Sequence, residues 1–134
     1  MISYIKLGAK DLAAAKRFYD AVLPPLGYCF TEEDGGLGYE RPDEATQPTI
    51  YVDTPFNCQP ATNGNGAMIA FQAQSQLQVR TLHAAGIKSG GTDEGAPGFR
   101  AAYSPQFYVA YLRDPTGNKI ALYSSNPDEP GRDD

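Results

Sequence analysis

The spacing of apolar residues divides the first part of the chain into short elements. In residues 2–8, apolar side chains fall close to alternating positions, which indicates a β-strand. Residues 12–22 carry apolar side chains at helical spacing, and Asp11 is placed to cap this helix by accepting hydrogen bonds from its first free amides. Pro24 and Pro25 end the helix, because a proline has no amide hydrogen to donate. Three extended segments follow, at residues 28–33, 37–41 and 49–53.

The second part begins after residues 54–66, which contain prolines and glycines but no charged residue. We interpret this stretch as a linker. An apolar strand is predicted over residues 67–72. A helix follows that is capped by Ser75 and runs to Ala85, and Gly86 is expected to end it in left-handed geometry.

The remaining elements complete a repeat of the first part. Residues 89–98 are rich in glycine and predict a loop. Two strands, at residues 108–113 and 119–124, lie on either side of a turn of sequence Asp-Pro-Thr-Gly-Asn at residues 114–118. Both halves therefore predict a β-α-β-β-β module, and this internal repeat constrains the fold more than any single element does.

Length and charge exclude several classes of protein. The chain has 134 residues, which fits one compact domain. Its formal net charge of −5 comes without a basic stripe, a poor match for a nucleic-acid backbone or an anionic membrane surface. No stretch approaches the ~18 apolar residues that cross a membrane, and the N-terminus lacks the pattern of a secretory signal. We therefore expect a cytoplasmic protein that contacts neither nucleic acid nor membrane.

Few residues are available to hold a metal. His83 is the one histidine of the chain, and Cys29 and Cys58 are its two cysteines. No zinc-finger-type or multi-histidine centre can be assembled from this set within one chain. Without an export signal, the cysteines are expected to be reduced thiols, although the sequence leaves open whether they pair. His83 is expected to be partly exposed and non-catalytic.

Four stretches, taken together in order and spacing, resemble a known superfamily. They lie at residues 1–4, 10–12 with 17–23, 66–71, and 111–121. In them the chain resembles the vicinal-oxygen-chelate superfamily of glyoxalase I, bleomycin-resistance proteins and extradiol dioxygenases, and it looks most like the short, single-domain bacterial members.

The resemblance implies an α+β fold, in which two βαβββ modules form a curled, cup-shaped mixed sheet with the helices outside. It covers residues 1–124, which we interpret as one glyoxalase-like domain. Module 1 spans about residues 1–53 and module 2 residues 67–124, joined by the linker at 54–66. The polar, acidic residues 125–134 are expected to form a disordered tail.

The resemblance also places the metal-binding positions of the family at Tyr4, Met68 and Ala121, where its metal enzymes carry two histidines and a glutamate. A neutral tyrosine is a poor ligand, a methionine sulfur suits only soft ions, and alanine offers no donor atom. We therefore expect a cup without the family's metal ion and without another cofactor.

Other candidate residues allow two interpretations each. Tyr111 matches the position of a catalytic tyrosine in extradiol dioxygenases, but the interpretation we favour is that it and Tyr108 are aromatic residues that line the core. Lys6 lies on the same side of its strand as Tyr4; if buried it could act as a base or imine former, and otherwise it is a solvated lysine. Arg100, in a loop that resembles a pocket rim, would suit a carboxylate or phosphate, or it is a surface cation.

The resulting hypothesis is a metal-free relative of the bleomycin-resistance proteins that binds a small, partly apolar organic molecule in an aromatic-lined cup. The residues expected to line this cup are Tyr4, Met68, Tyr108, Tyr111 and Ala121, with Arg100 at the rim. The alternative is a lyase or isomerase, or a dioxygenase-related enzyme, that uses tyrosine, Lys6 or a carboxylate in acid–base steps, or a metal held elsewhere. A third alternative is a collapsed cup in a dimerising scaffold. A homodimer is implied by the resemblance.

Overall fold

The computed structural model describes residues 1–133, and module 1 contains a helix and four strands. The elements are β1 (Tyr4–Gly8), α1 (Leu12–Val22), the 3₁₀ turn η1 (Pro24–Leu26), β2 (Cys29–Glu33), β3 (Gly36–Glu40) and β4 (Thr49–Asp53). The strands form sheet A in the order β1-β4-β3-β2. β1 and β4 are parallel, whereas the other neighbours are antiparallel.

Module 2 repeats this arrangement. Its elements are β5 (Ile69–Gln72), α2 (Gln76–Lys88), β6 (Thr92–Phe99), β7 (Tyr108–Arg113) and β8 (Lys119–Ser124). The strands form sheet B in the order β5-β8-β7-β6, and again only the first pair is parallel. The predicted α+β fold class and the internal βαβββ repeat are therefore confirmed, and the two curled mixed sheets remain unclosed.

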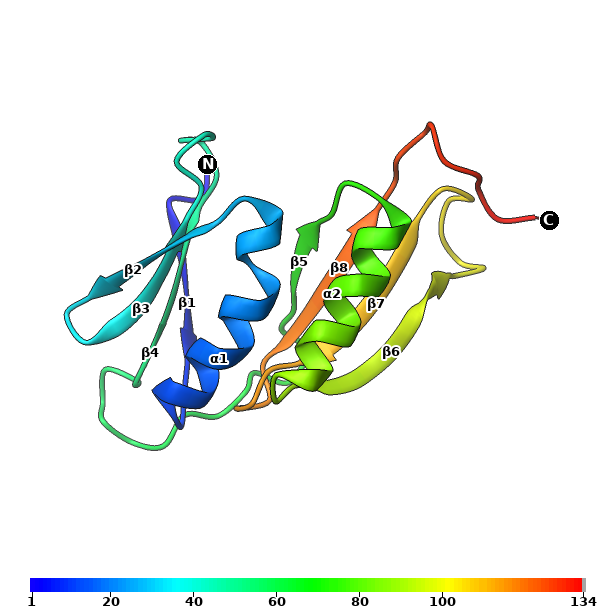
Figure 1. Cartoon of the computed structure of the whole chain (residues 1–134). Coiled ribbons are helices and arrows are strands. Elements are labelled where there is room, and N and C mark those ends of the chain that lie inside the picture. Colours follow the sequence, from blue (N-terminus) through cyan, green and yellow to red (C-terminus); the bar gives the residue numbers. More distant parts are fainter. Residues whose placement is uncertain (134) are drawn as a thin grey trace.

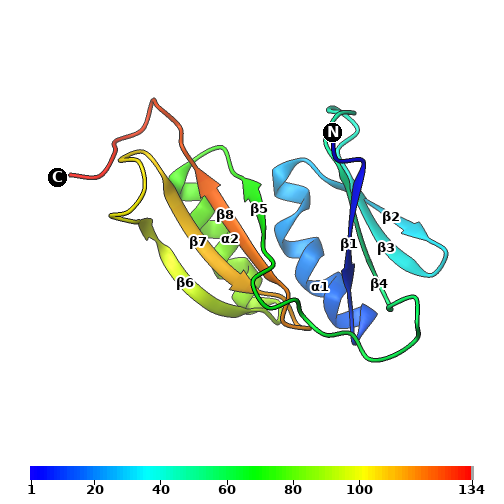
Figure 2. The same cartoon turned by 180° about the vertical axis from the view of Figure 1, so that it is seen from behind.

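Each helix covers one face of its own sheet, and α1 and α2 contact each other (Figure 1). Their apolar faces join one continuous core that includes Phe18 and Tyr39 of module 1 and Val79 and Leu112 of module 2. The opposite face of each sheet carries no helix. Figure 2 shows this open face of sheet B in front of α2. The fold thus presents two open sheet faces, one from each module.

The first helix begins as its sequence predicts. The Asp11 side chain accepts a hydrogen bond from the amide of Ala14 at 3.1 Å, and this satisfies one of the free donors of the first turn. Ala15, Tyr19 and Val22 are buried at the predicted helical spacing. Phe18 is also fully buried and completes the apolar stripe that faces the core.

The second helix does not end at Gly86, as the sequence analysis expected. It continues to Lys88, and Gly90 adopts the left-handed backbone conformation instead, with φ of 101°. Gly86 is needed for close packing, because a Cβ atom there would lie 2.7 Å from Leu112 Cδ1 and 3.2 Å from a ring carbon of Phe18. The glycine therefore lets α2 approach β7 and α1 closely.

The glycine-rich segment at residues 89–98 is not a loop, which is a second correction. Residues 92–99 form strand β6, which pairs with β7 through two register shifts. Gly95 and Gly98 lie opposite Tyr111 and Val109 at these irregularities. Pairing with β7 thus overrides the low strand propensity of glycine, which is common at bulges.

The turn at residues 114–118 joins module 2 to module 1. The buried Asp114 accepts a hydrogen bond from the hydroxyl of Tyr19 on α1 at 2.6 Å and others from the turn's own amides. Burial and the Asp114 carboxylate together raise the pKa of Tyr19 well above its ordinary value. The Asn118 side chain donates to the carbonyl of Gly8 on β1 at 2.9 Å. The turn therefore fixes the two modules relative to each other.

Residues 125–133 run along module 2 after β8. Glu129 accepts a hydrogen bond from the amide of Gln76 at the start of α2, and the amide of Arg132 donates to the carbonyl of Pro105. Neither α1 nor α2, the helices of the described part, has the length and apolar character needed to cross a membrane.

Candidate functional site

The open face of sheet B brings together three of the residues predicted to bind a ligand. Tyr111 on β7 lies directly opposite Ala121 on β8, and Ala121 is paired in turn with Ala70 on β5. Met68 immediately precedes β5 and is 46% exposed. Ala121 is almost fully buried, so it contributes a small apolar floor beside the larger side chains.

The Tyr111 ring is held in place by a glycine on the neighbouring strand. Gly95 on β6 is the register partner of Tyr111, and a Cβ atom at Gly95 would lie 2.6 Å from Cδ2 of the ring. The ring therefore lies across the β6 backbone, in space that only glycine leaves free. It is half-buried there and remains accessible from the open face.

Two cations lie near this ring. The Arg100 guanidinium carbon is 5.6 Å from the ring centroid, and the Lys119 ammonium nitrogen is 5.1 Å from it. These distances allow cation–π attraction, which is worth about 0.5–1 kcal/mol at exposed positions. Arg100 also donates to the backbone carbonyls of Ala96 and Phe99. Its guanidinium is thereby oriented, and within residues 1–133 it forms no ion pair with a carboxylate.

A third cation belongs to the same group. Arg113 on β7 lies directly opposite Lys119 on β8, and it forms an ion pair with Glu94 at 3.0 Å. We call Arg100, Arg113 and Lys119 the cationic cluster. Glu94 is the one acidic side chain that pairs with the cluster within residues 1–133. The cluster is therefore locally positive, although the whole chain is acidic.

Aromatic side chains lie farther along the same sheet. Tyr123 follows Ala121 by two residues on β8, and its ring stacks on Phe107 with centroids 5.3 Å apart. Phe107 in turn contacts Tyr103 edge-on at 5.3 Å. We call Tyr103, Phe107 and Tyr123 the aromatic strip. Polarity thus changes along β7 and β8, from the cationic cluster to the aromatic strip, with Tyr111 between them.

A cavity of about 570 Å³ lies next to the cationic cluster. It is bounded by the end of the linker, the residue before β5, and the outer ends of β7 and β8. Its lining residues are Asn63, Asn65, Gly66, Ala67, Met68, Arg113 and Lys119. This volume suits a small organic molecule, and the lining combines amide, thioether and cationic groups.

Tyr4 and Lys6 lie on the open face of sheet A, away from these residues. Tyr4 is 64% exposed and contacts Tyr51 edge-on, with centroids 5.7 Å apart. Lys6 is exposed and borders a separate cavity of about 410 Å³ against linker residues 55–62. Because Lys6 is not desolvated, the condition under which it would act as a base or imine former is not met in one chain.

Tyr108 lies on the helix-covered face of sheet B. It is buried, its hydroxyl accepts a hydrogen bond from Arg80 of α2 at 3.3 Å, and its ring packs edge-on against Phe99. Tyr108 and Tyr111 are three positions apart on one strand, so they point to opposite faces of the sheet. Tyr108 therefore takes no part in the open face.

The residues at the family's metal positions do not fit a divalent cation. Tyr4 lies on sheet A, Ala121 lies on sheet B and Met68 lies just before β5 of sheet B, and none of the three supplies imidazole or carboxylate. Across residues 1–133, moreover, no three side chains of histidine, cysteine, aspartate or glutamate are grouped so that they could hold a metal ion.

His83 is more buried than the sequence analysis expected. It is 7% exposed, and its Nε2 atom lies 2.9 Å from an Asp93 carboxylate oxygen. Hydrogen bonds from the Gly95 amide and from His83 lower the pKa of Asp93. This contact joins α2 to β6. Cys29 and Cys58 are both unpaired and exposed.

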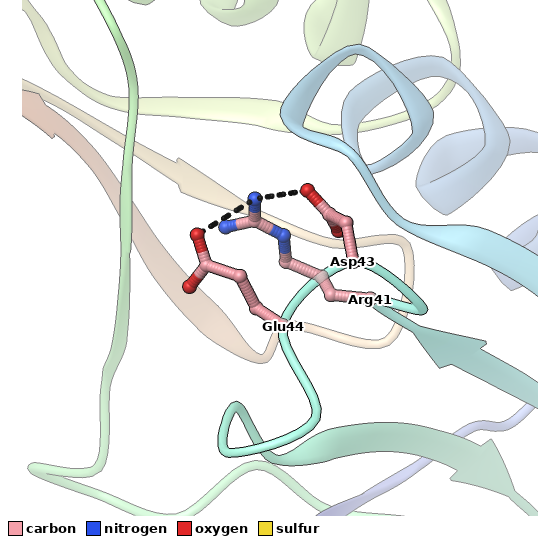
Figure 3. A network of polar contacts seen from close by, with 3 residues as sticks. All are labelled: Arg41, Asp43 and Glu44. Atoms are coloured by element: carbon pink, nitrogen blue, oxygen red, sulfur yellow. Dashed lines mark hydrogen bonds and ion pairs between the residues drawn. The ribbon is translucent and has the colours of Figure 1, made fainter.

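A second polar cluster lies at the boundary of the modules (Figure 3). The Arg41 guanidinium approaches Asp43 at 3.3 Å and Glu44 at 3.4 Å. A cavity of about 390 Å³ beside it is lined by residues of both modules. Because two carboxylates already neutralise this cation, the cluster offers no net positive charge to an anion.

Sequence reasoning missed Lys119 as a site residue. A signal was present, since Lys119 precedes Ala121 by two positions on one strand and must share its face. The sequence analysis also missed Gly95, whose role depends on its register partner Tyr111. That pairing links residues 16 positions apart across an irregular segment, and no local pattern predicts it.

The chain is similar in sequence and fold to several proteins of known structure. The chain is 44% identical to a glyoxalase/bleomycin resistance protein from Albidiferax ferrireducens, over 92% of this chain and 98% of that one, with a TM-score of 0.81. It is 18% identical to a glyoxalase-related enzyme from Fulvimarina pelagi over 92% and 87% of the chains, with a TM-score of 0.74.

A glyoxalase/bleomycin resistance protein/dioxygenase family enzyme from Burkholderia phytofirmans is 20% identical over 92% and 97% of the chains, with a TM-score of 0.69. At this identity, and at that of the Fulvimarina protein, the likeness concerns the fold alone. No protein-family model matches the chain, and no curated protein matches it either.

Proposed function

Since the chain belongs to the glyoxalase/bleomycin resistance/dioxygenase superfamily, we propose that it binds a small, partly apolar organic molecule on the open face of sheet B, without the metal ion of the family's enzymes. The observation that carries this proposal is the accessible Tyr111 ring, which lies on a helix-free sheet face beside the Ala121 floor. The donor set at the family's metal positions supports binding over metal-assisted chemistry.

Each residue of the proposed site has a physical role. Tyr111 and the aromatic strip supply flat apolar surface for stacking, and the tyrosine hydroxyls among them can add hydrogen bonds. Met68 can adapt its flexible side chain to an irregular ligand shape. Arg100 and Lys119 supply charge at the margin of the Tyr111 ring. Ala121 is a small residue of the sheet between these groups, and its neighbours almost fully cover it in one chain.

We further propose that two copies of the chain form a homodimer that covers the open sheet faces. Tyr4 on sheet A and Met68 beside sheet B are large apolar side chains that remain exposed in one chain. The edge strands β1 and β5 also have free backbone groups on one side, which a second copy can cover. Such pairing would complete the cup and exclude water from the ligand.

The acidic balance and the absence of a basic stripe support a partner that is a small molecule and not nucleic acid or membrane. We also keep the expectation of a cytoplasmic location, for which the exposed unpaired cysteines are the relevant feature. Residues 1–124 are proposed to act as one binding domain, because both modules share one core.

Isothermal titration of the purified protein with a panel of small aromatic and aliphatic metabolites tests the binding function. Tyr111→Leu should weaken binding of any compound found by about two- to tenfold, since aromatic contacts contribute roughly 0.5–1.5 kcal/mol beyond area burial. The matched control is Phe56→Leu, which changes an exposed linker ring and should leave affinity unchanged. A folded protein that binds no member of the panel would contradict the proposal.

Two further readouts separate binding from the enzyme alternative. Mass spectrometry of each bound compound after incubation should recover it unchanged; conversion to a product would instead support a lyase or isomerase. Elemental analysis of protein purified without chelator should find no stoichiometric Zn, Ni, Mn or Fe. One equivalent of any of these metals would overturn the metal-free proposal.

Light scattering after size exclusion tests the homodimer. The mass found should be twice that of one chain, and Tyr4→Glu should shift it towards the monomer by placing a charge on the open face of sheet A. Leu77→Glu is the control, because Leu77 on α2 is 62% exposed but lies outside both open faces. A monomeric wild-type protein would contradict this part of the proposal.

A further inference from the structure

We propose that the ligand of this site is an organic anion with an apolar body, whose charged group contacts Arg100 and Lys119 and whose body extends along sheet B towards the aromatic strip. This inference rests on the proposed binding function and names the chemical class of its ligand. A carboxylate on a planar unsaturated group is the simplest member of the class.

Within residues 1–133, Arg100 and Lys119 form no ion pair with an acidic side chain. In this part of the chain, the Arg100 guanidinium donates hydrogen bonds to two backbone carbonyls. The Lys119 ammonium lies over the Tyr111 ring. Two acidic groups of β6 are engaged elsewhere, Glu94 by Arg113 and Asp93 by His83. Both cations therefore keep donors free for a ligand.

Like charges lie side by side on the neighbouring strands β7 and β8. Arg113 and Lys119 are direct cross-strand partners, and like charges in this position destabilise a sheet. Arg100 adds a third positive charge near the Tyr111 ring. In a chain with net charge −5, such a concentration of cations is not a consequence of composition. An anion would relieve the repulsion and gain charge-assisted hydrogen bonds.

Along the open face of β8, the side chains change from charged to aromatic. Lys119, Ala121 and Tyr123 share one face of β8, so charge, a small floor and an aromatic ring follow one another at intervals of two residues. Arg100 reaches the same open face from the end of β6, because its guanidinium nitrogens lie near Gly95 and Gly98. A ligand with one anionic end and one apolar end matches this order.

The same arrangement disfavours other ligands. A cationic compound would add to the repulsion of the cluster, and a neutral amide would replace charge-assisted hydrogen bonds by weaker neutral ones. Glu94 offsets one of the three cations through its ion pair with Arg113 at 3.0 Å, and the positive charges of Arg100 and Lys119 remain. Among ligands of the same shape, the affinity of the site should therefore be highest for the anion and lowest for the cation.

The test compares three probes of nearly equal shape: cinnamate, cinnamamide and cinnamylammonium, each titrated into the wild-type protein by NMR or calorimetry at neutral pH. Cinnamate should bind at least about tenfold more tightly than the amide, because hydrogen bonds to charged groups add roughly 1.5–3 kcal/mol. The ammonium compound should bind most weakly.

Variants of single cations locate the effect. Lys119→Gln and Arg100→Gln should each reduce cinnamate affinity by about tenfold and leave cinnamamide affinity nearly unchanged. The control Lys88→Gln removes the same charge from the end of α2 and should change neither affinity by more than about twofold. Lys119→Gln should also leave the melting temperature unchanged or higher, since it removes repulsion with Arg113; a lower melting temperature would indicate a structural role.

The outcomes distinguish the two proposals. Equal binding of cinnamate and cinnamamide, or preference for the ammonium compound, overturns the anion inference while the binding function stands. Cinnamate binding that survives both cation substitutions also overturns it. If none of the three probes binds, the anion inference fails for this class, and the broader metabolite panel then decides on the binding function by itself.

Discussion

Asp114 shows how one buried carboxylate is stabilised by residues far apart in sequence. One of its oxygens accepts hydrogen bonds from the backbone amides of its own turn, and the other accepts from the Tyr19 hydroxyl and the Asn118 amide group. A buried charge is tolerated only when it is paired or fully hydrogen-bonded. The turn motif supplies the local bonds, while Tyr19 comes from the other module.

Tyr19→Phe tests this bond. The substitution removes the buried donor and leaves the Asp114 carboxylate partly unsatisfied, so the free energy of unfolding should fall by about 1.5–3 kcal/mol in urea denaturation. Tyr39→Phe is the matched control: its hydroxyl donates to the partly exposed Asp20, and the loss should be smaller. Equal losses in the two variants would contradict the role given to the buried bond.

The contact between His83 and Asp93 leads to a pH-dependent prediction. The folded-state pKa of Asp93 is lowered by the Gly95 amide and by His83, so the carboxylate form stabilises the folded protein. This contribution is present above the unfolded pKa of about 3.9, and it is lost as the pH falls through the lower folded-state pKa. The Asp93 side chain is exposed to solvent, so the effect should be small.

The melting temperatures of the wild-type protein and of Asp93→Asn should therefore differ above about pH 5 and converge as the pH falls through the folded-state pKa of Asp93, which lies below its ordinary value. Differential scanning calorimetry across this range measures the difference directly. Asp128→Asn is the control, because Asp128 is an exposed carboxyl outside this contact. A difference that persists unchanged in acid would show that Asp93 acts other than through its charge.

At the scale of elements, both the helix α2 and the strand β6 depend on glycines at positions where local propensity disfavours them. Gly86 stands inside a helix, where glycine is ordinarily unfavourable, because α2 must approach Leu112 and Phe18 closely. Gly95 and Gly98 stand in a strand, at the register shifts where β6 passes under larger side chains of β7. In both elements the neighbour across the contact, and not the local propensity, decides the structure.

Gly86→Ala distinguishes packing from propensity. In an exposed helix, the change would stabilise by roughly 0.5–1 kcal/mol. Here the new methyl group would lie 2.7 Å from Leu112 Cδ1, and the overpacking should destabilise the protein by about 1–3 kcal/mol. Chemical denaturation measures the change, with Thr81→Ala at an exposed position of α2 as control. A stabilised Gly86→Ala protein would contradict the close approach.

At the scale of the whole molecule, the two modules are joined by the core and by the turn before β8. α1 and α2 share the core, and Asn118 and Thr116 bond to the backbone of module 1. We therefore expect the modules to unfold together, as one domain.

Far-UV and near-UV circular dichroism should accordingly report one cooperative urea transition with coincident midpoints. The nine tyrosines give the near-UV signal, since the chain has no tryptophan. Residues of both modules contribute to each signal. Two separated transitions would show that the modules are independent domains.

Local patterns in the sequence determined most of the elements. The bounds of β4, β7 and β8 follow from apolar periodicity and turn residues, and the Asp11 cap follows from its side-chain chemistry. These features depend on residues that are close in sequence, so one sequence contains the information. The same two-residue period places Tyr123 on the face of β8 that carries Ala121, whereas the face it shares with Tyr111 depends on the pairing of β7 with β8.

Only the tertiary structure decided the rest. The interior place of Gly86, the strand at residues 92–99 and the His83–Asp93 contact each depend on a neighbour that is distant in sequence or on another element. The convergence of Arg100 and Lys119 on one ring has the same origin, as does the separation of Tyr4 from Tyr111. Periodicity states which face of an element is apolar, but only packing of whole elements determines what that face meets.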